Sequence, residues 1–111
     1  MTDYTEMITQ EVDYIEQNLK GNMCLDNIAN AAYCSPYHFH RIFKRIVGDT
    51  PGNYIRKRRL AEAAKELKES RKGILEIAMD YGFESQAAFT YAFKRQFNNP
   101  PGYDRKNSAP P

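Results

Sequence analysis

Residue types that commonly build metal sites and catalytic centres are scarce in this chain, which has two histidines and two cysteines among 111 residues. Cys24 and Cys34 lie outside any Cys-x-x-Cys pair, so we expect reduced thiols rather than a zinc site or a disulfide. His38 and His40 would point about 200° apart on a helix, so one metal ion cannot bind both. With no catalytic triad pattern and no glycine-rich phosphate loop, we expect neither an enzyme nor a cofactor.

Basic and aromatic side chains instead recur at spacings of three and four residues, which places them on one face of a helix. They are Tyr37, His40, Arg41, Lys44 and Arg45. Arg41 can donate two hydrogen bonds to a guanine edge, Lys44 and Arg45 suit phosphates, and Tyr37 and His40 can reach either. The ordinary alternative for a single run of charge is a solvated helix face.

An internal repeat weighs against that alternative. Residues 35–52 (SPYHFHRIFKRIVGDTPG) match residues 85–102 (SQAAFTYAFKRQFNNPPG) at an offset of 50. Upstream, the match continues at an offset of 49, with Leu25, Ile28 and Ala29 opposite Ile74, Ile77 and Ala78. Two copies of one helical unit therefore make up most of the chain, and a basic face at the same place in both favours binding.

Each copy is predicted to form two helices joined by a tight turn. In the second copy, Gly82 ends one helix and Ser85 caps the next. In the first copy, Tyr33 occupies the turn, Ser35 and Pro36 begin the second helix, and Gly48 ends it. The expected inner residues are Leu25, Ile28, Ala29, Ala32, Phe39, Ile42, Phe43 and Ile46 in the first copy, and Ile74, Ile77, Ala78, Tyr81, Phe89, Ala92, Phe93 and Phe97 in the second. This is the helix-turn-helix pattern.

Two further helices are expected outside the repeated units. Residues 54–69 are rich in strong helix formers, with Ile55, Leu60, Ala63, Ala64 and Leu67 facing inward. Residues 3–19 are expected to form an N-terminal helix with an acidic outer face, and its inner residues are Met7, Ile8, Val12, Ile15 and Leu19. We therefore predict an all-α chain with a helix-turn-helix subdomain at 1–53, a linker helix at 54–70, a second helix-turn-helix subdomain at 71–106 and a tail at 107–111.

The net charge of +2 is small, but the charge is unevenly distributed. Residues 36–59 contain seven Lys or Arg and one Asp, whereas residues 1–24 are mainly acidic. The acidic helix is thus expected to face away from any nucleic acid. The acidic N-terminus does not resemble a signal peptide, and no apolar stretch is long enough to span a membrane, so we expect a cytoplasmic protein.

At these residues the chain resembles the DNA-binding domain of the AraC/XylS family of bacterial transcription regulators, over about residues 5–106. The most specific segments are LDNIA at 25–29, SPYHFHR at 35–41, YIR at 54–56 with RLA at 59–61, and DYGFESQ at 80–86. The resemblance implies about seven helices, in two helix-turn-helix units joined by a long helix. It also implies that each unit places a recognition helix in one of two successive major grooves of double-stranded DNA.

Carried over by position, the resemblance assigns base contacts to Tyr37, His40 and Arg41 in the first unit and to Gln86, Ala87, Ala88 and Tyr91 in the second. Family members commonly have arginine where this chain has Tyr91, which weakens the case for base recognition by the second unit. A second departure is Asn98, where the family pattern has glycine. Phosphate contacts are expected from Ser35, Lys44, Arg45, Arg56, Ser85, Thr90, Lys94 and Arg95.

The favoured function is a sequence-specific transcription regulator that binds double-stranded DNA as a monomer, because one chain already contains two readers. RNA polymerase is a candidate second partner. The alternative is a protein-interaction module that docks an acidic partner through the Tyr37, His40 and Arg41 face. The central segments look most like members with a further effector-binding domain, so the chain is either a complete regulator or the DNA-binding part of a longer one.

Overall fold

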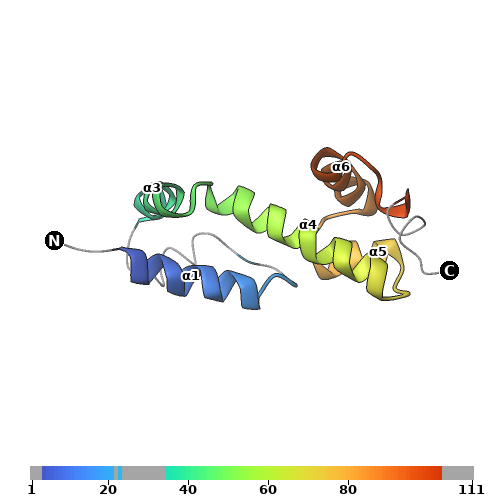
Figure 1. Cartoon of the computed structure of the whole chain (residues 1–111), viewed down its shortest axis with the longest axis horizontal. Coiled ribbons are helices and arrows are strands. Elements are labelled where there is room, and N and C mark those ends of the chain that lie inside the picture. The colour runs from blue at the N-terminus through green and yellow to red at the C-terminus, as the bar shows by residue number, and fades with distance from the viewer. Residues whose placement is uncertain (1–3, 22, 24–34, 104–111) are drawn as a thin grey trace. The chain divides into compact units, whose positions relative to one another are not determined.

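The computed structural model describes residues 4–21, 23 and 35–103, and this part of the chain is helical without strands. Its helices are α1 (Thr5–Gln17), α3 (Pro36–Val47), α4 (Pro51–Glu69), α5 (Ile74–Asp80) and α6 (Gln86–Phe97), followed by helical residues 101–103 (Figure 1). The predicted all-α class is confirmed. The helix expected from Leu25 to Ala32, the Tyr33 turn, both cysteines and the tail at 107–111 lie outside the described residues.

The chain forms two compact units. Unit 1 comprises residues 1–19 and 23–56, and unit 2 comprises residues 20–22 and 57–111. Helix α4 contributes its first turns to unit 1 and the remainder to unit 2. The chain therefore enters unit 2 first at Lys20, is back in unit 1 at Met23, and passes into unit 2 again within α4.

In unit 1, α1 packs against α3. Its core contains Ile8, Ile15, Leu19, Phe39, Ile42, Phe43 and Ile55, all of them predicted inner residues. The Phe43 ring meets the Tyr54 ring edge-on at 5.7 Å, and the Tyr54 hydroxyl donates to Glu16 Oε2 at 2.8 Å. This bond ties the first turn of α4 to α1. The prediction for Ile46 is wrong, because its side chain is 41% exposed: periodicity identifies the inner face of α3 but not how far along the helix the core extends.

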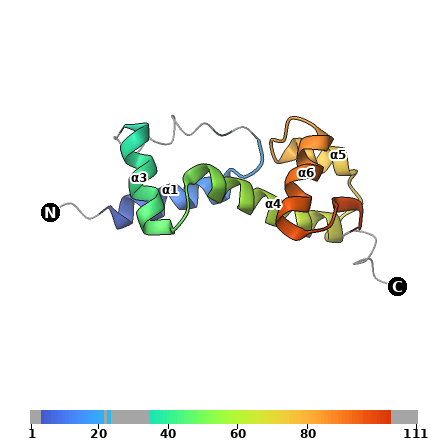
Figure 2. The same ribbon diagram turned by 90° about the horizontal axis from the view of Figure 1, so that it is seen from above.

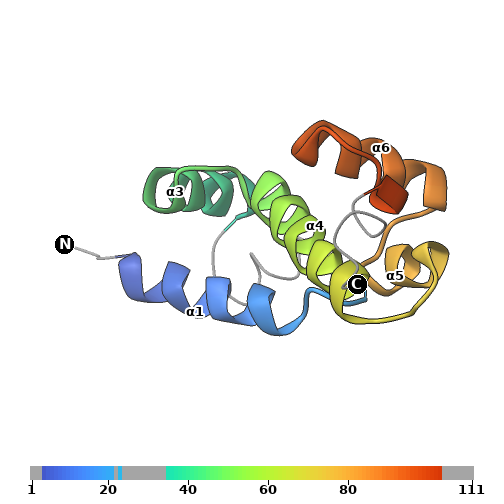
Figure 3. The same cartoon turned by 45° about the vertical axis from the view of Figure 1, so that its right-hand side comes forward.

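In unit 2, α5 lies beside α6, as Figures 2 and 3 both show. The turn between them is a Schellman motif, in which Gly82 N–H donates to the Met79 carbonyl at 3.1 Å and Phe83 N–H to the Ala78 carbonyl at 3.0 Å. Gly82 has a φ of +80°, and a Cβ there would lie 2.9 Å from both Arg59 Nη1 and the Gly21 carbonyl oxygen. The predicted helix stop at Gly82 is therefore confirmed.

Four aromatic rings contact one another in a row along the inner face of α6. Phe83 contacts Phe89 at 5.1 Å between ring centres, Phe89 contacts Phe93 at 5.6 Å, and Phe93 contacts Phe97 at 4.6 Å. Phe89 and Phe93 are fully buried, as are Ile77 and Ala78 on α5. Edge-on and tilted ring pairs add to the stabilisation that comes from burial alone. The core thereby fixes which face of α6 remains exposed.

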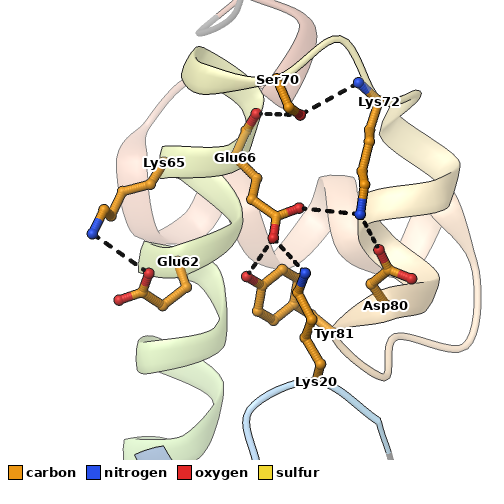
Figure 4. A network of polar contacts seen from close by, with 8 residues as sticks. All are labelled: Lys20, Glu62, Lys65, Glu66, Ser70, Lys72, Asp80 and Tyr81. Atoms are coloured by element: carbon orange, nitrogen blue, oxygen red, sulfur yellow. Dashed lines mark hydrogen bonds and ion pairs between the residues drawn. The ribbon is translucent and has the colours of Figure 1, made fainter.

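A polar network joins α4, α5 and Lys20 within unit 2 (Figure 4). Glu66 Oε1 forms an ion pair with Lys20 at 2.6 Å and accepts a hydrogen bond from the Tyr81 hydroxyl at 3.1 Å. Glu66 Oε2 is shielded from solvent and has Lys72 Nζ at 4.0 Å; Lys72 also bonds Asp80 at 3.2 Å. The network holds α5, which supports α6, against the end of α4.

Helices α3 and α6 begin in the same way. Ser35 Oγ accepts from His38 N–H at 3.1 Å, and Ser85 Oγ accepts from Ala88 N–H at 3.0 Å. Both serines are therefore N-caps, as predicted. Helix α4 begins at Pro51, three residues before the predicted start at Tyr54. Proline fits the first turn of a helix, and the Thr50 hydroxyl accepts from the third residue of α4 at 3.2 Å.

Candidate nucleic-acid interface

The outer face of α3 carries the basic and aromatic residues expected to bind. Tyr37 is 73% exposed, and His40, Arg41, Lys44 and Arg45 are exposed with it. The opposite face of the same helix is buried against the core of unit 1. The amphipathic pattern of residues 36–47 therefore places these five side chains together on one solvent-facing surface.

The positive charge on this face is not neutralised within the described part of the chain. Helix α3 contains no acidic residue, and neither Arg41, Lys44 nor Arg45 forms an ion pair with a described residue. On α4, by contrast, Arg58 pairs with Glu62 at 2.9 Å. Uncompensated cations on one surface attract polyanions and raise their rate of association.

The guanidinium of Arg41 lies over the ring of Tyr37, with Cζ 5.8 Å from the ring centre. This cation–π pair joins residues one helical turn apart, so the i,i+4 spacing in the sequence could have predicted it, although the sequence analysis did not. His38 differs from His40, since its ring meets Tyr4 edge-on at 5.8 Å, before the start of α1. Both histidines are exposed, and the ring contact with Tyr4 distinguishes His38 from His40.

Helix α6 presents the corresponding face of unit 2. The exposed residues are Ser85, Gln86, Ala87, Ala88, Tyr91, Lys94 and Arg95, whereas Thr90 is half-buried. The helix contains two cations and no acidic residue, and neither cation pairs with an acidic group in the described ranges. This face is less basic than that of α3, because small side chains occupy its first turn.

Tyr91 and Arg95 form a second aromatic–guanidinium pair, which the sequence analysis also missed. Arg95 Cζ lies 5.7 Å from the centre of the Tyr91 ring, and Arg95 Nη1 donates to the Tyr91 hydroxyl oxygen at 3.1 Å. Tyr91 is 65% exposed. Of the predicted phosphate contacts outside the two recognition helices, Arg56 is exposed on α4 and donates to Asn53 Oδ1 at 2.6 Å.

Other kinds of site find no support in the described residues. No three His, Cys, Asp or Glu side chains gather there in a way that could hold a metal ion. Within the same residues, no helix combines the length and the apolar character that crossing a membrane would need.

A family model described as a helix-turn-helix domain matches residues 28–107. The chain is 45% identical over 107 residues to the probable transcription factor PqrA of Proteus vulgaris, covering 95% of this chain and 88% of that protein. It is 42% identical over 90 residues to the multiple antibiotic resistance protein MarA of Escherichia coli K12, covering 81% and 71%.

A solved structure gives the same result for the fold. The DNA-binding domain of the global transcriptional factor AdpA, determined in complex with a target DNA, superimposes with a TM-score of 0.86 at 26% sequence identity. The superposition covers 90% of each chain. The likeness therefore extends across both units.

Proposed function

Because the chain belongs to the AraC/XylS family of helix-turn-helix DNA-binding transcription regulators, we propose that it recognises a specific double-stranded sequence with α3 and α6 in successive major grooves. Helix α3 is the recognition helix of the first helix-turn-helix subdomain, residues 1–53, and α6 is that of the second, residues 71–106. The linker segment at 54–70 joins the two subdomains. One chain thus supplies both readers and binds as a monomer, in the cytoplasm.

The observation that carries this proposal is the pair of exposed, acid-free helix faces on α3 and α6, each begun by a serine cap. On α3, Arg41 donates to a guanine edge while Tyr37 and His40 contact neighbouring bases. On α6, base contacts come from Gln86, Ala87, Ala88 and Tyr91. Phosphate contacts come from Ser35, Lys44, Arg45, Arg56, Ser85, Thr90, Lys94 and Arg95.

The direct test is selection of bound sequences from a random pool of double-stranded DNA, followed by affinity measurements on the selected site. We expect an asymmetric site of about 20 base pairs, since two major grooves on one side of B-DNA lie about 10.5 base pairs apart. Arg41→Ala should weaken the free energy of binding by about 1–3 kcal/mol and relax the base preference at one position of the site. Lys44→Ala, the matched control on the same face, should weaken binding to all sequences alike.

The proposal fails if the chain shows no preference for any DNA over competitor at moderate salt. In that case the basic face of α3 would instead serve the alternative function, docking of an acidic protein. Capture of RNA polymerase without DNA, lost in Arg41→Ala, would support that alternative.

A further inference from the structure

The internal repeat makes the outer faces of α3 and α6 directly comparable. At the offset of 50, Tyr37, Arg41 and Arg45 on α3 correspond to Ala87, Tyr91 and Arg95 on α6. Each helix carries a tyrosine and an arginine one turn apart. The pair is Tyr37 and Arg41 on α3, but Tyr91 and Arg95 on α6. The pair on α6 is therefore displaced by one helical turn, about 6 Å, toward the C-terminus.

The geometry of the displaced pair brings an arginine back toward the slot that Tyr91 occupies. Side chains on a helix lean toward its N-terminus, so the guanidinium of Arg95 lies over residue 91 rather than over its own Cα. The ring face, at 5.7 Å from Cζ, and the hydroxyl, at 3.1 Å from Nη1, hold it there. On α3 the same lean places the guanidinium of Arg41 over Tyr37, so the two guanidinium groups also differ by one helical turn. On α6 the guanidinium of Arg95 covers residue 91, the position that corresponds to Arg41.

The held guanidinium retains most of its capacity to bind. Arginine has five N–H donors in a rigid planar fork, and the Tyr91 hydroxyl takes one of them. Arg95 forms no ion pair with any described residue, and both side chains are exposed. Fixing the fork before binding reduces the conformational entropy that would otherwise be lost on contact with DNA.

We propose that Arg95 is the base-reading arginine of the second unit, donating to N7 and O6 of one guanine, and that Tyr91 is the residue that positions it. This inference rests on the proposed function and replaces the expected roles, in which Tyr91 contacts a base and Arg95 a phosphate. A phosphate contact requires charge but little orientation. A guanine contact requires an oriented fork, which is what Tyr91 supplies.

The experiment repeats the selection with the full chain and five variants, and then measures affinities for the best site and for the same site with the candidate G·C pair changed. Wild type should prefer guanine at one position of the second half-site by about 5- to 150-fold. Arg95→Ala and Arg95→Lys should both abolish this preference, because lysine keeps the charge but lacks the fork. Arg95→Lys should leave the dependence of affinity on salt unchanged.

The two tyrosine variants test positioning. Tyr91→Phe keeps the ring face and removes the hydrogen bond, so its guanine preference should lie between those of wild type and Tyr91→Ala. Lys94→Ala, a neighbouring exposed cation, is the control that should weaken all sequences equally. Retention of the guanine preference in Arg95→Lys, or in Tyr91→Ala, would overturn the inference.

A phosphate contact would give a different result, in which Arg95→Ala weakens all sites equally and makes the salt dependence shallower. That result also overturns the inference. Failure of the proposed function is recognised separately: wild type would then select no sequence in either half-site. If wild type selects both half-sites, Arg41→Ala relaxes the first and no change at Arg95 affects the second, only the inference fails.

Discussion

Equivalent residues of the two repeats end α3 and α6 with different chemistry. Gly48 follows α3 with a φ of +94°, and Asn98 follows α6 with a φ of +68°. Each N–H bonds the carbonyl of the lysine four residues earlier. After glycine, asparagine is the residue that best tolerates this left-handed conformation. The departure of Asn98 from the family pattern therefore preserves the helix end.

Replacement of Asn98 tests this account. Asn98→Ala should lower the free energy of unfolding by about 1 kcal/mol, since alanine pays the steric cost of positive φ. Asn98→Gly should be at least as stable as wild type. Urea unfolding measures both, with Asn99→Ala as the control that should have little effect. An equally large loss in the control would refute the assignment of the cost to φ.

Gly48 and Gly82 both have positive φ, but only Gly82 is closely surrounded by other atoms. Comparing their substitutions therefore separates the energetic cost of the backbone conformation from the cost of crowding. At Gly48 an added Cβ meets nothing within 4 Å, whereas at Gly82 it lies 2.9 Å from a backbone oxygen and from Arg59. Gly48→Ala should therefore cost about 1 kcal/mol, the conformational term alone. Gly82→Ala should cost distinctly more, because Gly21 would have to move. Equal shifts of the urea midpoint in Gly48→Ala and Gly82→Ala would show that the turn at Gly82 accommodates the added Cβ without an energetic cost.

At the scale of elements, the polar network around Glu66 fixes how α5 packs against α4. Burial alone would raise the pKa of Glu66, but hydrogen bonds from Lys20 and Tyr81 and the charges of Lys20 and Lys72 outweigh it and lower the pKa. The hydrogen bond to Asp80 and its charge raise the pKa of Lys72. A lowered carboxyl pKa means that the ionised form stabilises the folded state.

This stabilisation should be fully present above pH 4.5, the ordinary pKa of the group, and lost as the pH falls through the lower pKa of the folded state. Glu66→Gln should lower the free energy of unfolding by about 1 kcal/mol at pH 7. The amount is modest because the lysine partners of Glu66 are half-exposed and solvent screens their charges. The difference in the free energy of unfolding between variant and wild type should diminish in acid. Urea unfolding at pH 7 and pH 3 measures it, with Glu69→Gln as the exposed control. A difference that is constant with pH would contradict the assigned role.

The elements were largely predictable from the sequence, but several of their contacts were not. Serine caps and stops at Gly48 and Gly82 follow from local backbone requirements, so residue type and spacing predict them. Lys20 is different, because its bond to Glu66 joins residues far apart in sequence, and no periodic pattern encodes it. The Tyr91–Arg95 pair follows the i,i+4 rule and was therefore predictable from the sequence, although the two residues were assigned separately to a base and a phosphate.

At the scale of the molecule, the proposal predicts how binding depends on salt. If about six phosphates are neutralised, the logarithm of the association constant should fall with the logarithm of salt concentration at a slope of about −5. Removing one phosphate-binding cation, as in Lys44→Ala, should make the slope shallower by about 1. Fluorescence anisotropy at several salt concentrations gives both slopes. A slope near zero would be incompatible with an interface built on these cations.

The three crossings of the chain between its units constrain any attempt to dissect the molecule. Lys20 and Gly21 belong to unit 2 although they precede most of unit 1. A fragment beginning at Lys57 would lack the carbonyl that accepts from Arg59 and the lysine that pairs with Glu66. A protein truncated within α4 therefore does not contain an intact unit 2. A faithful isolated unit would need a circularly permuted chain, in which the Lys20–Gly21 segment is restored through a new connection.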